Sequence, residues 1–208
     1  MAQKKKNIRR PVQDRSIASK ERIINSAYQL VKKKGYVNTG IRDIADLAEV
    51  SVGTFYAYYK DKDAIGFEVI RKYGEEFYGK LATDVIAILP KKADLKQIIL
   101  EILIRMKKIA KENIKLHKEF AILSLTDPSF GSAVKQVEQE RIQVELSKIL
   151  EYFGSQILLK SKPSSLSVAQ RVMDDITTYM VLQGFSISDE EVLEETAVMI
   201  SGYLGKKG

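Results

Sequence analysis

Residues 39 to 62, TGIRDIADLAEVSVGTFYAYYKDK, constrain the fold most, because they have the pattern of two short helices joined by a tight turn. Apolar side chains recur at helical spacing in the first half, at Ile41, Ile44, Ala45 and Ala48. The period breaks at Val50 and Ser51. Ser51 is a suitable N-cap for a second helix that continues through Tyr59, since a serine hydroxyl accepts hydrogen bonds from first-turn amides. The stretch predicts a helix, a turn and a helix.

The second of these helices has two different faces. Phe55 and Tyr59 lie four residues apart and share one side, while other residues point elsewhere: Val52, Thr54, Tyr56 and Tyr58. All four aromatic residues between 55 and 59 could instead be core, but helical spacing keeps Tyr56 and Tyr58 off the side of Phe55. One face packs and the other presents hydroxyls, which is the layout of a DNA-reading helix-turn-helix.

The residues that carry the motif resemble the DNA-binding signature of the TetR family of transcriptional regulators. They are Arg42, Ile44, Ala45, Val50, Ser51, Gly53, Thr54, Phe55, Tyr56, Tyr59, Lys60, Asp61 and Lys62. The resemblance implies an all-α fold, and the helix signals along the chain predict about nine helices. A three-helix DNA-binding domain would come first, followed by a helical domain for ligand binding and dimerisation.

The resemblance also implies DNA contacts at nine positions: Arg42, Ser51, Val52, Gly53, Thr54, Tyr56, Tyr58, Lys60 and Lys62. By this comparison Arg42 reaches a guanine edge or a phosphate, and Val52 meets a thymine methyl group. Gly53 allows close backbone approach. Thr54 and Tyr56 match phosphate contacts, Tyr58 matches a position that faces bases, and Lys62 opens a helix whose amides favour a phosphate.

Two positions depart from the family pattern. Glu49 stands where the family usually has the turn glycine, and a side chain in a left-handed turn costs roughly 1 kcal/mol. Gly40 stands where a threonine or serine often caps the first helix, which leaves Thr39 as the candidate cap.

The net charge is concentrated at one end of the chain. Residues 1 to 63 contain 14 Lys or Arg against 7 Asp or Glu, whereas residues 64 to 208 contain 20 of each, so the whole net charge of +7 lies in the first part. This segregation favours a polyanion-binding head and predicts DNA binding that weakens with salt.

Composition and helix signals divide the chain into three parts. Residues 1–15 are expected to form a basic flexible arm that contacts DNA or merely an unstructured tail. By the TetR resemblance, residues 16–62 form the helix-turn-helix domain and residues 63–208 the effector-binding and dimerisation domain. Besides the two short helices, the expected helices span about 16 or 19 to 34, 63–89, 94–111, 113–125, 127–153, 165–183 and 188–204. Asp94 with Gln97 and Ser188 with Glu191 have the spacing of capping boxes.

The last two helices are apolar over a width that one contact within a monomer does not need. The TetR resemblance places a homodimer interface there, at Val172, Met173, Ile176, Tyr179, Met180, Leu193, Thr196, Ala197 and Ile200. A dimer also supplies the two heads that a palindromic operator requires. Part of each helix must still serve the core of its own chain.

The resemblance places a pocket for a small-molecule effector among the middle helices. Polar candidates there are Tyr78, His117 and Arg141, although His117 is also expected as an ordinary core residue and Arg141 as a salt-bridge partner of a nearby glutamate. The abundance of aliphatic and aromatic residues suits a lipophilic ligand, but ordinary cores share this composition.

Enzymatic functions are disfavoured, and no catalytic residue, cofactor or metal is expected. The chain has one histidine and no cysteine, so a histidine pair for a metal and a thiol nucleophile are both missing. Asp174 and Asp175 are adjacent and diverge on a helix. Without cysteine, a signal peptide or a stretch long enough to span a membrane, the chain suits the cytoplasm and no membrane partner.

The resemblance to the TetR family therefore implies a homodimeric repressor that binds double-stranded DNA at a palindromic operator and is released by a small lipophilic ligand. Two alternatives remain open. One is a constitutive or architectural DNA-binding protein without ligand control, and the other is a helical ligand-binding protein that has lost operator recognition.

Overall fold

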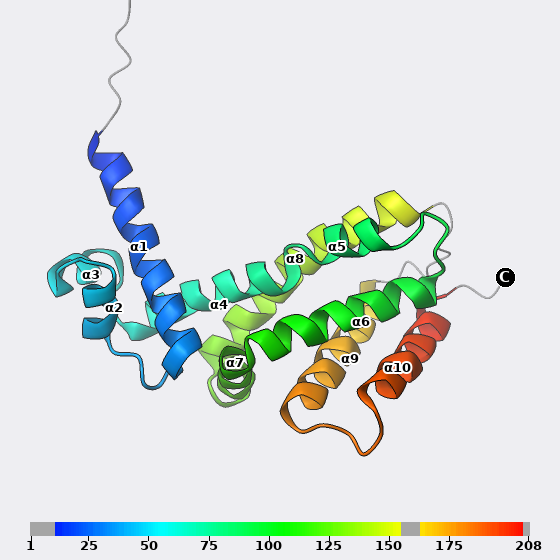
Figure 1. Cartoon of the computed structure of the whole chain (residues 1–208). Helices are drawn as coiled ribbons and strands as arrows, with labels where there is room; N and C mark the ends of the chain where they lie inside the picture. The colour runs from blue at the N-terminus through cyan, green and yellow to red at the C-terminus, as the bar shows by residue number, and fades with distance from the viewer. Residues whose placement is uncertain (1–10, 155–162, 206–208) are drawn as a thin grey trace, which may run out of the picture. The chain divides into compact units, whose positions relative to one another are not determined.

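The computed structural model describes residues 11–154 and 163–205, and the regular elements in these ranges are all α-helices (Figure 1). They are α1 Pro11–Lys34, α2 Ile41–Leu47, α3 Val52–Tyr58, α4 Lys62–Tyr78, α5 Leu81–Ile88, α6 Leu95–Glu112, α7 Ile114–Thr126, α8 Pro128–Phe153, α9 Pro163–Leu182 and α10 Asp189–Leu204. The expected all-α fold is confirmed. None of the described helices has the length and apolar character needed to cross a membrane.

The chain divides into two compact units, which meet between Val69 and Ile70 inside α4. In the first unit, α1, α2, α3 and the start of α4 bury a shared core that includes Ile23, Ile44, Phe55 and Ile65. The expected arm at residues 1–15 needs a correction, since α1 begins at Pro11 and residues 11–15 are helical. Residues 1–10 lie outside the described residues.

The expected helix over residues 63–89 is two helices, which accounts for the count of ten in the described ranges. The backbone leaves the helical path at Lys80, where φ is −120° and ψ is 2°. Glycine at position 79, just before the break, is a poor helix former. The start of α5 is capped from another helix, because the buried Glu145 of α8 accepts a hydrogen bond from the Ala82 amide at 2.8 Å.

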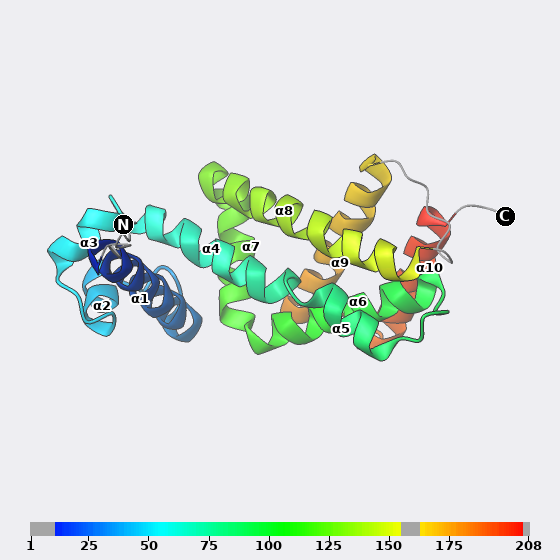
Figure 2. The ribbon, with the colours of Figure 1, turned by 90° about the horizontal axis from the view of Figure 1, so that it is seen from above.

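In the second unit, α9 and α10 lie side by side against α6, and α5 runs beside α8 (Figures 1 and 2). The α6, α9 and α10 helices bury a common apolar cluster, in which Leu103 and Ala197 are fully enclosed. Gly74 allows α4 and α8 to approach closely, since a Cβ atom there would lie 2.1 Å from Cγ1 of Val137.

Side-chain caps begin several of these helices as the sequence predicts. Asp94 accepts a hydrogen bond from the Gln97 amide at 2.8 Å while the Gln97 side chain accepts one from the Asp94 amide at 2.9 Å, so this capping box is confirmed. Ser188 accepts a hydrogen bond from the Glu191 amide at 3.2 Å and caps α10. Asp127 caps α8, whose first residue is a proline, through the Ser129 amide at 2.8 Å.

Candidate functional site

The turn between α2 and α3 has the geometry that its sequence predicts. The Ser51 hydroxyl accepts a hydrogen bond from the Thr54 amide at 3.0 Å, which confirms Ser51 as the N-cap of α3. Glu49 lies in the left-handed region with φ of 54°, and it is the one non-glycine residue with positive φ among the described residues. The turn therefore keeps its left-handed step with a side chain in place of the usual glycine.

Helix α3 has one buried and one open face. Phe55 is fully buried and Tyr59, at the C-cap, is 5% exposed, so both anchor the helix to its unit. Tyr56 is 53% exposed and Gly53 is also exposed. The predicted separation of packing and presenting residues is confirmed for these positions.

Tyr58 lies differently from the expectation that it faces bases. Its hydroxyl donates a hydrogen bond to Oγ of Ser16 at 3.0 Å and is partly buried. The phenol thus ties α3 to α1 inside the unit, because a hydroxyl group on a large ring finds a partner when it is buried. The side chain of Tyr58 is half-buried and bridges α3 and α1.

The cations of the motif lie at the edges of the helix pair. Arg42 on α2 is exposed, and Lys60 is largely exposed with its Nζ 3.6 Å from Oδ2 of Asp61. Lys62 is held more firmly, since its ammonium group donates to the Val37 carbonyl at 3.1 Å and lies 4.6 Å from the centroid of the Tyr36 ring.

The cap of α2 is not the threonine suggested by the sequence. Thr39 is buried and donates its hydroxyl hydrogen to the Gly35 carbonyl at 2.7 Å. The Asp43 carboxylate instead accepts from the Gly40 amide at 3.0 Å and pairs with the Lys34 ammonium at 2.6 Å. The hydrogen bond from Lys34 is the main cause that lowers the pKa of Asp43, with the Gly40 amide second.

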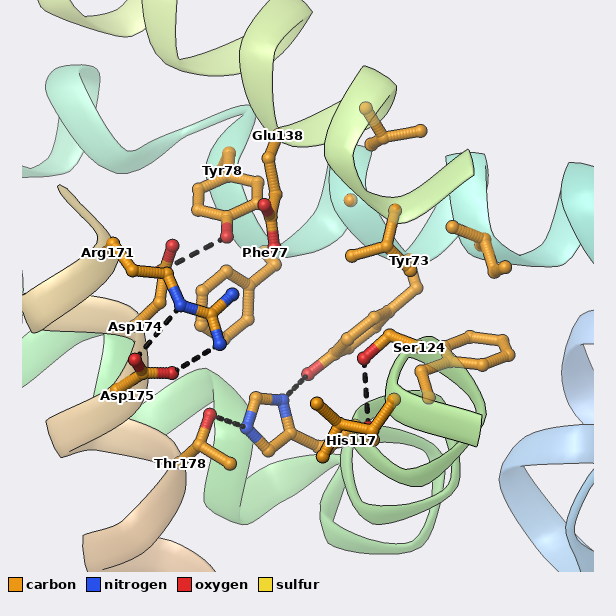
Figure 3. A pocket seen from close by; sticks show the side chains of 17 residues that line it. Tyr73, Phe77, Tyr78, His117, Ser124, Glu138, Arg171, Asp174, Asp175 and Thr178 are labelled. Atoms are coloured by element: carbon orange, nitrogen blue, oxygen red, sulfur yellow. Dashed lines mark hydrogen bonds and ion pairs between the residues drawn. The ribbon is translucent and has the colours of Figure 1, made fainter. Parts of the chain in front are cut away.

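The second unit contains a pocket with a volume of about 160 Å³, formed by α4, α7, α8 and α9 (Figure 3). Aromatic rings form much of its wall: Tyr73, Phe77, Tyr78 and Phe120. Tyr78 and His117, which the sequence suggests as ligand-binding residues, both line it. The structure thus brings together two of the three suggested side chains.

His117 is held between two hydroxyl groups. Its Nδ1 lies 2.8 Å from the Tyr73 hydroxyl and its Nε2 lies 3.0 Å from the Thr178 hydroxyl, as the dashed lines in Figure 3 show. The ring is stacked on Phe77 with centroids 5.7 Å apart. Burial lowers the pKa of His117 from 6.5 to about 4, so the imidazole is neutral near pH 7.

Two carboxyl groups that sequence reasoning missed face this pocket from different helices. Asp174 of α9 accepts a hydrogen bond from the Tyr78 hydroxyl at 3.1 Å, and Glu138 of α8 points toward the Tyr78 ring (Figure 3). Burial, and then the charge of Glu138, raise the pKa of Asp174 to about 7. Burial also raises the pKa of Glu138. Burial, followed by the Asp174 charge, raises the pKa of Tyr78 well above its usual value.

The remaining charges at the pocket compensate each other. Arg171 binds Asp175 through two hydrogen bonds, from Nε at 2.9 Å and from a terminal nitrogen at 2.6 Å. The adjacent aspartates diverge as the sequence predicts, but Asp174 turns toward Glu138 of another helix. A pairing between α8 and α9 has no local signal in the sequence.

Arg141 does not line this pocket, which corrects its assignment as a ligand-binding residue. Its guanidinium group pairs with the Glu75 carboxylate of α4, and that carboxylate lies 3.6 Å from Arg71 as well. The physical reason is the proximity of an acidic partner on the neighbouring helix, which is the salt-bridge alternative considered for Arg141.

The residues assigned to the dimer interface separate into two groups. Five are buried within their own chain at 5% exposure or less and have no surface to give to a partner: Met180, Leu193, Thr196, Ala197 and Ile200. This is a correction, and its cause is the packing of α9 and α10 against α6. Val172, Met173 and Ile176 are half-buried, and Tyr179 is exposed. Further exposed apolar residues on these two helices are Val168, Val198, Met199 and Tyr203.

The first unit matches a known family. Residues 23–69 match the family of bacterial regulatory proteins named tetR. The chain is 24% identical over 186 residues to YuxN and 32% identical over 184 residues to YerO, both of Bacillus subtilis strain 168 and both described as uncharacterized HTH-type transcriptional regulators. These alignments cover 83% of this chain but 58% and 60% of the two relatives, so the chain spans about three fifths of their length.

Solved structures share the fold. The multidrug binding protein EbrR, solved in complex with imidazole, is 17% identical, with a TM-score of 0.68 over 90% of this chain and 96% of that chain. A TetR-family regulator from Mesorhizobium loti has the same TM-score at 18% identity, covering 92% and 99% of the two chains. Residues 23–69 therefore match the tetR family of bacterial regulatory proteins, and the described residues share the fold of solved regulators of that family.

Proposed function

We propose that the protein is a homodimeric, sequence-specific transcriptional repressor. It binds a palindromic operator in the cytoplasm and is released by a small lipophilic ligand. The observation that carries DNA recognition is the open face of α3, where Gly53 and Tyr56 are exposed while Phe55 and Tyr59 anchor the opposite side. A recognition helix needs one buried face that fixes it to its domain and one exposed face that can contact DNA.

The exposed polar residues near this face suit two kinds of DNA contact, one to base edges and one to phosphates. Arg42 is exposed on α2 and suits a bidentate contact to guanine, a contact worth about 1–3 kcal/mol of base discrimination. Lys60, Thr54 and Tyr56 suit phosphate contacts, which position the protein without reading sequence. The excess of Lys and Arg in residues 1–63 adds attraction along the DNA backbone.

Dimerisation is proposed through the solvent side of α9 and α10. After the buried residues are excluded, this side offers an apolar set formed by Val168, Val172, Tyr179, Val198, Met199 and Tyr203. Val172 is half-buried and the other five side chains are exposed, and apolar surface of this kind along two neighbouring helices is suited to burial against a second copy. Two copies would present two recognition helices to the halves of a palindrome.

Release by a ligand is proposed through the pocket of the second unit. Helix α4 contributes Tyr73, Phe77 and Tyr78 to this pocket and also supplies Ile65 to the core of the first unit. A ligand that favours one conformation of this helix and DNA that favours another would weaken each other's binding. The similarity in fold to a multidrug binding protein supports a small-molecule effector.

The test is selection of bound duplexes from a random DNA library at near-physiological salt. An enriched inverted repeat, with half-sites about one helical turn or a small multiple apart, is expected for a sequence-specific dimer. Binding without sequence preference would indicate an architectural role, and absence of binding would indicate a ligand-binding protein without operator recognition.

Matched lysine variants test the surface itself. Lys60→Ala should weaken binding to all sequences and reduce the slope of log affinity against log salt by about one, as expected for a lost phosphate contact. Lys118→Ala removes the same charge from an exposed position in α7 and should leave affinity unchanged. Equal effects of the two variants would contradict the assignment of Lys60.

A further inference from the structure

A second pocket, with a volume of about 110 Å³, adjoins the first within the same unit. Its wall is almost wholly apolar and comes mainly from α6, α8 and α9, with Ile98, Ile102, Ile149 and Leu166 among the residues. An apolar cavity of about 150 Å³ can hold benzene, and this pocket is smaller, so it suits a short alkyl chain, which is narrower than an aromatic ring.

The two pockets share Tyr78 and Asp174. The hydrogen bond between these side chains, 3.1 Å long, lies where one pocket borders the other. On the side of the first pocket, Glu138 completes a group of two carboxyls beside aromatic rings (Figure 3). Tyr78 and Asp174 are therefore a common wall, and an elongated molecule that displaces this pair would contact the carboxyls with one end and the apolar residues with the other.

The positive charges that face the first pocket are fewer than its carboxylates. On α4 and α7, Tyr78 and His117 are neutral near pH 7, and Tyr73 contributes a hydroxyl group that is hydrogen-bonded to His117. On α9, Arg171 is bonded to Asp175, and its single positive charge also acts on Glu138 and Asp174. On α8, Lys135 is exposed and acts on Glu138 less strongly than burial does.

Glu138 itself lacks a partner. Within residues 11–154 and 163–205, its carboxylate forms no hydrogen bond or ion pair with a neighbouring side chain, although burial penalises its charge. A cation in the pocket would remove this penalty and would also be attracted to the faces of Tyr73 and Phe77. An anionic head group would be repelled, and a neutral one would leave the carboxylate unpaired.

We propose that the ligand is a small amphiphilic organic cation whose charged head lies beside Glu138 and Asp174 and whose alkyl chain enters the second pocket. This inference rests on the proposed control by a ligand and names its chemical class. The size of the first pocket suits a head such as trimethylammonium or a single protonated ring.

Isothermal titration calorimetry of the full chain with hexyltrimethylammonium tests the proposal at pH 8. Affinity should increase up to about fourfold for each methylene group from butyl to hexyl, because each buried methylene contributes about 0.8 kcal/mol. Tetramethylammonium should bind more weakly than the hexyl compound, and octanoate should bind at least about tenfold more weakly. Octanoate that binds as tightly as the cation would overturn the proposal.

Variants locate the two ends of the ligand. Glu138→Gln should reduce hexyltrimethylammonium affinity by about tenfold or more, since a charged partner is lost. Glu140→Gln removes the same charge from an exposed position on α8 and should have no effect. Ile102→Phe narrows the apolar pocket and should weaken the hexyl compound but not tetramethylammonium, with circular dichroism confirming the fold. Equal effects of Glu138→Gln and Glu140→Gln would refute the placement of the head.

These measurements are independent of DNA. A protein that selects an inverted repeat but binds none of the cations keeps its proposed role as a regulator and loses this ligand class. A protein that binds the cations but no DNA supports the ligand class and refutes the proposed regulator.

Discussion

Replacing Asp174 by asparagine should change the pH dependence of stability. Burial and the neighbouring Glu138 raise the pKa of Asp174 from 3.8 to about 7 in the folded protein. The folded state therefore binds this proton more tightly than the unfolded state does. Asparagine keeps the size of the side chain and an oxygen that can accept from the Tyr78 hydroxyl, but it does not titrate.

The magnitude follows from the two pKa values. Between pH 3.8 and about 7 the wild-type protein should lose up to about 1.4 kcal/mol of unfolding free energy per pH unit relative to Asp174→Asn. The difference should total at most about 4 kcal/mol and stay constant above pH 7. This is an upper limit, because the carboxyl group borders a pocket that water can enter.

Urea unfolding followed by circular dichroism at several pH values measures this difference. The variant should gain stability relative to the wild type as pH rises from about 4.5 to 8. A difference that is the same at both ends of this range would refute the reasoning, since it would mean that Asp174 has similar pKa values in the folded and unfolded states.

His117 has the opposite effect on the pH dependence of stability, so it also distinguishes the wild type from Asp174→Asn. Its pKa falls from 6.5 to about 4 on folding, so the unfolded state takes up this proton first and stability is lost as pH decreases through this interval. In the wild type the contributions of Asp174 and His117 largely cancel between pH 4 and 6.5. The Asp174→Asn variant should expose the contribution of His117 as a steeper loss of stability in acid.

Three further substitutions test local features. Glu49→Gly should raise the free energy of unfolding, measured in urea, by roughly 0.5–1 kcal/mol. The reason is that removing the side chain relieves the left-handed backbone conformation by more than the entropy cost of glycine. A decrease would show that the turn is unstrained. Gly53→Ala should leave stability unchanged or slightly higher, since an added Cβ meets nothing closer than the Ser51 Oγ at 3.6 Å. DNA affinity, measured by fluorescence anisotropy, should fall because the added methyl group prevents close backbone approach. Unchanged affinity would exclude such an approach. Glu145→Ala should lower the free energy of unfolding by about 1–3 kcal/mol, because it leaves the Ala82 amide without its acceptor. Glu145→Gln keeps an acceptor oxygen and should retain part of that stability. Equal losses in the two variants would mean that the hydrogen bond is unimportant.

Local signals in the sequence were sufficient for the helix-turn-helix and for most helix starts. The Ser51 cap, the Asp94 capping box and the burial of Phe55 each depend on residues a few positions apart, where propensity and spacing act directly. The division of the expected helix 63–89 shows the limit of such signals. Glycine 79 weakens that helix, but the cap that starts α5 comes from Glu145, 63 residues further along the chain.

The pocket could be predicted only in part, for the same reason. Tyr78 and His117 stand out as polar residues on apolar helical faces, but Glu138 and Asp174 read as ordinary helical carboxylates until α8 and α9 are placed together. The interface prediction was wrong at Met180 and Leu193 because an apolar stripe does not reveal whether its partner is another chain or a neighbouring helix.

The hydrogen bonds of His117 give the pocket wall a reversible polarity. A neutral imidazole carries one hydrogen, and its two nitrogens face the hydroxyls of Tyr73 and Thr178. With the hydrogen on Nδ1, the Tyr73 oxygen accepts from the ring and its own hydrogen points away from the imidazole. With the hydrogen on Nε2, Tyr73 donates to the ring and presents its lone pairs instead. A shift between tautomers would let the same wall act as a donor toward one molecule and as an acceptor toward another, without any movement of the backbone.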